Sequence, residues 1–91
     1  MLKGIVRDNI VSTRKQESLV GSKFLEVQLI ENNLLTEKYL IAVDSVGAGI
    51  GELVLVATGS AARVGCDQAN APIDAAIVGI IDDGSAIEAL N

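Results

Sequence analysis

The sequence contains no histidine and no tryptophan, one cysteine and one proline, and only two aromatic residues, Phe24 and Tyr39. Without histidine there is no imidazole general base, no Ser–His or Cys–His catalytic pair and no imidazole metal ligand. Cys66 can form no disulfide within the chain, and it has no second cysteine or histidine with which to build a zinc site. These absences exclude most side-chain combinations that perform nucleophilic or metal-assisted catalysis.

Basic side chains are almost absent from the second half of the chain. Residues 1–42 hold six basic and five acidic side chains, whereas residues 43–91 hold seven acidic side chains and one basic residue, Arg63. The second half therefore carries a charge of −6, and the whole chain −5. Nucleic acid would meet net repulsion here, and two aromatic residues offer few platforms for stacked bases. We therefore expect no nucleic-acid partner.

Long hydrophobic runs are also missing, although 49% of the residues are hydrophobic and the mean hydropathy is +0.43. The longest apolar stretches, such as residues 53–57 and 75–78, fall far short of the roughly 20 residues that span a bilayer as a helix. The first residues lack the charged, apolar and small-residue pattern of a signal peptide. We expect a cytoplasmic protein without a membrane segment.

The apolar content is high for so short a chain. Ninety-one residues correspond to a single domain, residues 1–91. A domain of this size buries only about 60% of the surface that its unfolded chain exposes, so its own core cannot cover all of its hydrophobic side chains. We expect the surplus to contact a partner, most simply further copies of the same chain.

Valine and isoleucine are frequent, and few windows show the periodicity of a helix, which predicts an all-β fold. Closing short strands into a barrel removes exposed edges, so we expect a small five-stranded OB-like Greek-key barrel. One short helical turn is expected from Ser60, whose hydroxyl can cap it, to Arg63, and a second within residues 86–91. The predicted strands are residues 2–13, 24–30, 38–43, 53–57 and 73–82.

Local patterns refine this barrel. In the second predicted strand, alternation places Leu25, Val27 and Leu29 on the core side. Residues 31–37 contain two consecutive asparagines and are expected to form the turn of a hairpin between the second and third strands. The first predicted strand breaks strict alternation, which indicates a β-bulge near Asp8-Asn9.

Three glycines at every second position, Gly47, Gly49 and Gly51, could present backbone amides to a phosphate. Their spacing is not that of a nucleotide-binding loop, however, and a strand follows instead of a helix. We expect these glycines to permit positive φ angles or close approach of backbones.

Charged residues elsewhere also have a functional and a structural explanation. Arg63 could assist anion binding at the turn that begins at Gly59, but as the one basic residue of an acidic half it is expected to pair with a carboxylate. Asp74 and Asp82 lie beside apolar stretches, and a small enzyme that used them would need both in one pocket. We expect a solvated location for these carboxylates and no catalysis.

Three segments together have a familiar order and spacing. They are VSTRK at residues 11–15, AVDSVGAGIGE at 42–52 followed by GSAAR at 59–63, and PIDAAIVGIID at 72–82. In combination they resemble the EutN/CcmL family of bacterial microcompartment vertex proteins. Any one segment would be a weak signal, whereas three in register are specific.

The resemblance implies a structural protein without catalytic residues or cofactors. Such a chain would assemble as a homopentamer and close the five-fold vertices of a polyhedral protein shell, beside hexameric proteins that form the facets. The lack of the longer tail of some carboxysomal members slightly favours a catabolic compartment over a carboxysome. The alternative, from the residues alone, is an OB-like module that binds a nucleic acid or another ligand.

The positions that match the family fall into two groups. Subunit contacts or the central opening are implied for Asp44, Gly47, Ala48, Gly49, Gly51, Gly59, Ser60, Ala61 and Arg63. Strand-end and core positions of the family correspond to Ser12, Thr13, Asp74, Gly79 and Asp82.

Overall fold

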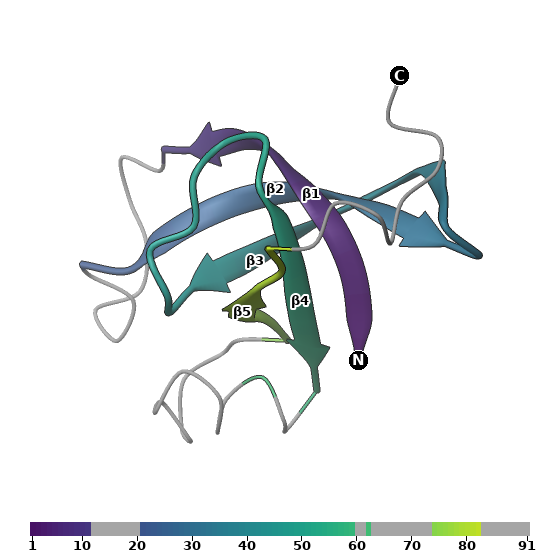
Figure 1. Ribbon diagram of the computed structural model, residues 1–91. Helices are drawn as coiled ribbons and strands as arrows, with labels where there is room; N and C mark the ends of the chain where they lie inside the picture. Colours follow the sequence, from purple (N-terminus) through teal and green to yellow (C-terminus); the bar gives the residue numbers. More distant parts are fainter. Residues whose placement is uncertain (12–20, 60–61, 63–73, 83–91) are drawn as a thin grey trace.

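The computed structural model describes residues 1–11, 21–59, 62 and 74–82. Five strands close into a barrel in the order β1-β2-β3-β5-β4, in which β3 and β5 run parallel and the other neighbours antiparallel (Figure 1). The predicted all-β OB-like barrel is confirmed. The strands are β1 Leu2–Ile10, β2 Lys23–Glu31, β3 Leu34–Asp44, β4 Leu53–Thr58 and β5 Ala75–Ile80.

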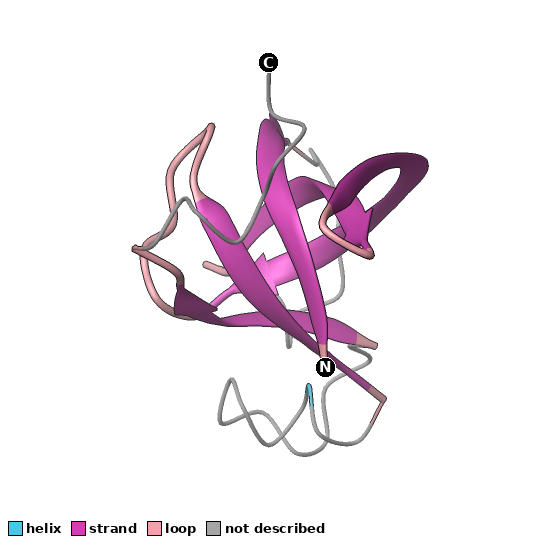
Figure 2. Ribbon diagram, turned by 45° about the vertical axis from the view of Figure 1, so that its right-hand side comes forward, coloured by secondary structure: helices cyan, strands magenta, loops and turns pink. Residues whose placement is uncertain are grey.

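The core fills the barrel interior, around which the strands curl in Figure 2. Leu25 and Val27 are fully buried, and Leu29 is partly buried against them, as the alternation of β2 predicts. Alternate positions of β2 and of β4 enter the main core cluster, which also takes one residue each from β1, β3 and β5 and one from the loop before β4. The main cluster contains Val6, Leu25, Val27, Ala42, Ala48, Val54, Val56 and Ile77.

A bulge lies in β1, one residue before its predicted position. The register with β2 shifts between Val6 and Asp8, so that Arg7 is the extra residue. Val6 is fully buried, whereas Arg7 and Asp8 are exposed. The bulge therefore separates the buried part of β1 from its polar end, and Ser12 and Thr13 lie outside the described residues.

The turn of the β2–β3 hairpin is much shorter than predicted. It consists of Asn32 and Asn33 alone, with φ angles of 55° and 61°, the left-handed pair that a two-residue hairpin turn requires. Residues 34–37 belong to β3, and the hairpin projects beyond the barrel (Figure 1). The prediction failed because the ladder is irregular here: Thr36 Oγ1 donates to the Leu29 carbonyl oxygen at 2.8 Å where the register shifts.

β5 is also shorter than predicted and closes the barrel. It pairs with β3 only at Val43 with Ala76 and at Asp44 with Ile77, and with β4 along its length. Beyond its end, the amide of Ile81 donates to the Leu53 carbonyl at 2.8 Å. Ala62 lies in a helical turn, whereas Ser60, Arg63 and residues 86–91, where the other helical expectations fall, are outside the described residues.

Gly4 is a position that sequence patterns did not single out. It lies buried in β1, where a Cβ atom would overlap Val27 Cγ1 and come within 2.8 Å of the Gln28 carbonyl oxygen. Because one of these neighbours is backbone, the strand pair cannot accept even a methyl group without moving. Gly79 differs, since its added Cβ would meet Leu55 at an ordinary 3.6 Å.

We expect Gly4→Ala to lower the free energy of unfolding by about 1–3 kcal/mol, the range for overpacked cores. Gly79→Ala is the matched control and should change it by less than about 0.5 kcal/mol. Urea unfolding at one fixed protein concentration measures both. Equal effects of the two substitutions would show that the β1–β2 approach is not the constraint.

Candidate functional site: the glycine-rich loop

The loop between β3 and β4 is organised by Asp44, the last residue of β3. Its Oδ1 atom accepts hydrogen bonds from the amides of Val46 and Gly47, both at 3.1 Å. The Asp44 side chain is only 2% exposed. Aspartate forms such turns because its short carboxylate reaches the amides two and three residues further along. Gly47, with φ of 78°, then continues in a conformation that other residues rarely adopt.

Lys23, at the start of β2, holds the same loop from the other side. Its Nζ donates to the Ala48 carbonyl oxygen at 3.2 Å and lies 3.9 Å from Asp44 Oδ2. Ala48 is 1% exposed and belongs to the main core cluster. The loop arches from the end of β3 to the start of β4 (Figure 1), and the Ala48 methyl group packs into the barrel interior beneath it.

The second part of the loop is fixed by Glu52 and by β1. Glu52 Oε1 accepts from the Gly49 amide at 2.6 Å, and the Glu52 amide donates to the Gly49 carbonyl at 3.1 Å. The Gly51 amide, at φ of 90°, donates to the Val6 carbonyl at 2.7 Å. Positive φ angles are thus present at Gly47 and Gly51, whereas a Cβ at Gly49 would meet only Glu52 Oε1, at 3.2 Å.

These contacts decide what the loop can do chemically. A phosphate-binding loop leaves its amides free for the ligand, but here the amides of Val46, Gly47 and Gly49 are donated to the chain's own carboxylates. The carboxylates of Asp44 and Glu52 therefore occupy the amides that a bound phosphate would need. The loop also presents two large apolar side chains to solvent, since Val46 is 40% exposed and Ile50 60%.

The second glycine turn is tied to the start of β5. The Gly59 amide, at φ of 66°, donates to the Asp74 carbonyl at 2.8 Å, and the Ala62 amide donates to the Gly59 carbonyl at 3.1 Å. Ala62 is fully buried against Val43 and Ala76. The other positions expected here, Ser60, Ala61 and Arg63, lie outside the described residues.

The two carboxylates of the enzyme hypothesis are not brought together. Asp74 precedes β5 and Asp82 follows it, so an extended strand separates them by roughly 25 Å, at about 3.3 Å per residue. Both residues are exposed. Within residues 1–11, 21–59, 62 and 74–82 there is no group of three or more acidic or cysteine side chains that could hold a metal ion.

Three residues whose side chains hold the loop in place were not predicted from the sequence. Lys23 becomes a neighbour of Asp44 only through the β2–β3 register, which no local pattern specifies. Ser45 Oγ donates to the Ile77 carbonyl at 2.5 Å, and β5 is distant in sequence. Glu52 could have been found, because an acid three residues after Gly49 has the spacing of a capping turn.

With this geometry established, comparison with known proteins identifies the family. The family model described as "Ethanolamine utilisation protein EutN/carboxysome" matches residues 1–82. The chain belongs to the EutN/CcmL family. This confirms the resemblance carried by the three sequence segments. Since the proteins of the family that match are shell vertex proteins, a structural and not an enzymatic role is also confirmed.

EutN/CcmL relatives cover most of the chain. The "Carboxysome shell vertex protein CcmL" of Gloeobacter violaceus is 48% identical over 80 residues, which are 87% of this chain and 80% of that protein. The "Bacterial microcompartment shell vertex protein PduN" of Salmonella typhimurium is 46% identical over 78 residues, 80% of this chain and 86% of that protein.

No helix among the described residues is long and apolar enough to cross a membrane.

A solved structure of the EutN/CcmL family overlays the whole chain. It is the "GrpN pentameric microcompartment shell protein from Rhodospirillum rubrum", with a TM-score of 0.80, 41% identity and 100% coverage of both chains.

Substitutions of Asp44 test which interaction holds the glycine-rich loop in place. We expect Asp44→Ala to lower the free energy of unfolding by roughly 1–2 kcal/mol, because two loop amides lose their acceptor. Asp44→Asn retains an oxygen at the Oδ1 position and should lose less than about half of that amount. Both are measured by urea unfolding. Equal losses would mean that the charge beside Lys23, and not the pair of hydrogen bonds, holds the loop.

Proposed function

We propose that this protein is a structural subunit of a bacterial microcompartment shell in the cytoplasm, and that five copies form a ring that closes a shell vertex. The observation that carries the proposal is the overlay of the entire chain on a protein described as a pentameric microcompartment shell protein. Membership of a family whose curated relatives are shell vertex proteins supports it.

The distribution of apolar side chains supports a ring. Each subunit of a closed ring presents two different surfaces to its neighbours, and both must be covered. Several large hydrophobic side chains of the described residues remain exposed on the isolated subunit. They are Met1, Leu2, Val11, Leu34, Tyr39, Ile41, Val46, Ile50 and Ile80.

We assign the two glycine turns, residues 44–51 and 59–63, to packing around the five-fold axis. The first turn suits this role because internal hydrogen bonds fix its shape while Val46 and Ile50 stay exposed. A loop that is already ordered loses little conformational entropy on association. In the second turn, Ser60, Ala61 and Arg63 would lie near the central opening.

Hexameric facet proteins of the shell are the proposed partners of the ring. The preference for a catabolic compartment gains no support, because a carboxysome protein and a PduN protein match with 48% and 46% identity. The proposal is therefore a microcompartment shell of either kind. The alternative of an OB-like binding module is not favoured by the comparisons.

Native mass spectrometry tests the ring directly. We expect a species of about 47 kDa, five times the chain mass of 9.4 kDa, at micromolar concentration. A monomer across the whole micromolar range would overturn the proposal. A hexamer would retain a shell role but remove the five-fold vertex.

A substitution in the loop separates ring formation from folding. Gly49→Val should weaken the pentamer more than the barrel, because Gly49 has no positive φ and its Cβ would meet only the flexible Glu52 side chain. Gly47→Val is the control, since a φ of 78° strains any β-branched residue and should destabilise the barrel itself. Mass spectrometry and urea unfolding measure the two effects. A Gly49→Val chain that assembles normally would remove this loop from the interface.

A further inference from the structure

The outer face of the β2–β3 hairpin carries exposed apolar side chains that the barrel does not use. Tyr39 and Ile41 lie two residues apart on β3 and are 52% and 47% exposed. They therefore share one face of the strand, opposite to Ala42, which is buried in the core. Across the ladder Tyr39 faces Gln28, and Ile41 faces Glu26.

Two carboxylates border this face at adjacent positions. Glu26 of β2 pairs in register with Asp8 of β1, so the row across three strands reads Asp8, Glu26, Ile41. Like charges directly opposite each other destabilise a sheet. Among the described residues no lysine or arginine forms an ion pair with either carboxylate, and the nearby Arg7 donates from Nε to Gln28 Oε1 at 2.7 Å. Within residues 1–11, 21–59, 62 and 74–82, this acidic pair beside the exposed apolar face thus has no basic partner.

This acidic strip, defined as Asp8, Glu26, Tyr39 and Ile41, continues toward the glycine-rich loop. The Gly51 amide bonds to the Val6 carbonyl, so the loop lies beside β1 two residues before Asp8. Ile50, 60% exposed, precedes Gly51 in that loop. The strip and the loop assigned to subunit packing therefore border each other on the surface.

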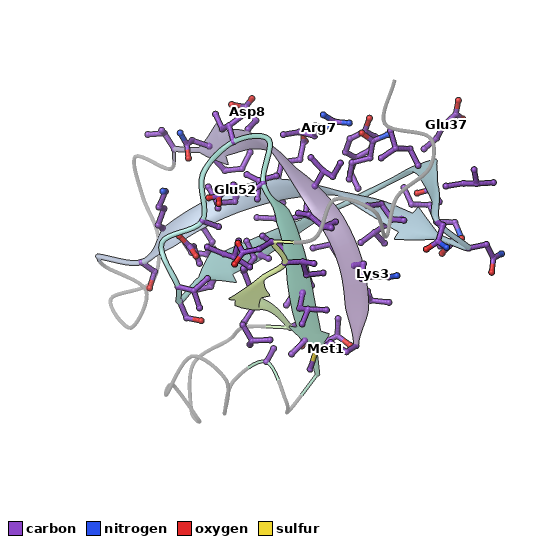
Figure 3. The ribbon with its side chains drawn as sticks, in the orientation of Figure 1. Met1, Lys3, Arg7, Asp8, Glu37 and Glu52 are labelled. Carbon is purple, nitrogen blue, oxygen red and sulfur yellow. The ribbon has the colours of Figure 1, made fainter. Side chains whose placement is uncertain are left out.

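The opposite end of β1 has the complementary chemistry. Leu2 and Met1 are 37% and 79% exposed, and Lys3 follows them without an ion pair among the described residues. Figure 3 shows Met1 and Lys3 at one end of β1 and Asp8 at the other. We call Met1 and Lys3, which lie at this end of the chain, the basic edge. An acidic apolar surface and a basic apolar surface at two ends of one strand are what a head-to-tail contact requires.

We propose that, in the ring, the acidic strip of one subunit receives the basic edge of the next, with Lys3 placed against Asp8 and Glu26. This inference rests on the proposed pentamer and names the surfaces that form it. It also explains why the sheet holds two opposed carboxylates: a lysine of the neighbouring copy compensates them.

Charge exchange tests the contact. Glu26→Lys places a cation opposite Asp8, which should leave the subunit at least as stable to urea while raising the concentration for half-dissociation of the ring by at least about tenfold. Lys3→Glu should weaken the ring by a similar factor. The double variant carrying both changes should regain much of the affinity, because the two charges are exchanged and their attraction is retained. Glu37→Lys is the control, since Glu37 is exposed on β3 outside the strip and away from Asp8 (Figure 3).

The outcomes separate this inference from the proposed function. A wild-type chain that stays monomeric would overturn the pentamer itself. A wild-type pentamer that Glu26→Lys and Lys3→Glu leave unchanged would keep the pentamer and overturn this contact. Weakening by both single variants without recovery in the double variant would show that the two surfaces do not meet each other.

Discussion

The hydrogen bonds of the Asp44 carboxylate are the interaction on which the shape of the glycine-rich loop and its link to the barrel depend. Asp44 stands where three parts of the barrel meet: its backbone is in register with Lys23 of β2 on one side and with Ile77 of β5 on the other. Its nearly buried side chain accepts the two amides that start the loop to β4. A buried carboxylate is stable only where such partners surround it. One residue thus links barrel closure to the shape of the glycine-rich loop.

The loop illustrates how a small domain can present a rigid surface without a large core. Its amides are donated to Asp44, Glu52 and Val6, and Ala48 anchors it in the core. The shape is therefore set before any partner arrives, and the exposed side chains of Val46 and Ile50 are available for contact. Preorganisation of this kind lowers the entropy lost on assembly, which would favour the ring proposed above.

Local patterns predicted the parts of the fold that depend on neighbours in sequence. Alternation in β2 correctly placed Leu25 and Val27 in the core, and broken alternation in β1 located the bulge to within one residue. The hairpin turn was predicted too long because the first residues of β3 do not alternate between buried and exposed positions. At Thr36 a hydrogen bond from the side chain to the Leu29 carbonyl links the two strands where their register shifts. Such irregular pairing depends on the opposite strand, which no window of a single strand contains.

By itself, the sequence determined the class of fold, the family, and the absence of histidine-based chemistry, because these follow from residue types and from motifs in a fixed order. Only the tertiary structure decided which residues meet. The close approach at Gly4, the link between Lys23 and Asp44, and the opposed carboxylates of Asp8 and Glu26 all arise between strands. The physical reason is that strand register, unlike strand periodicity, is fixed by the packing of the whole barrel.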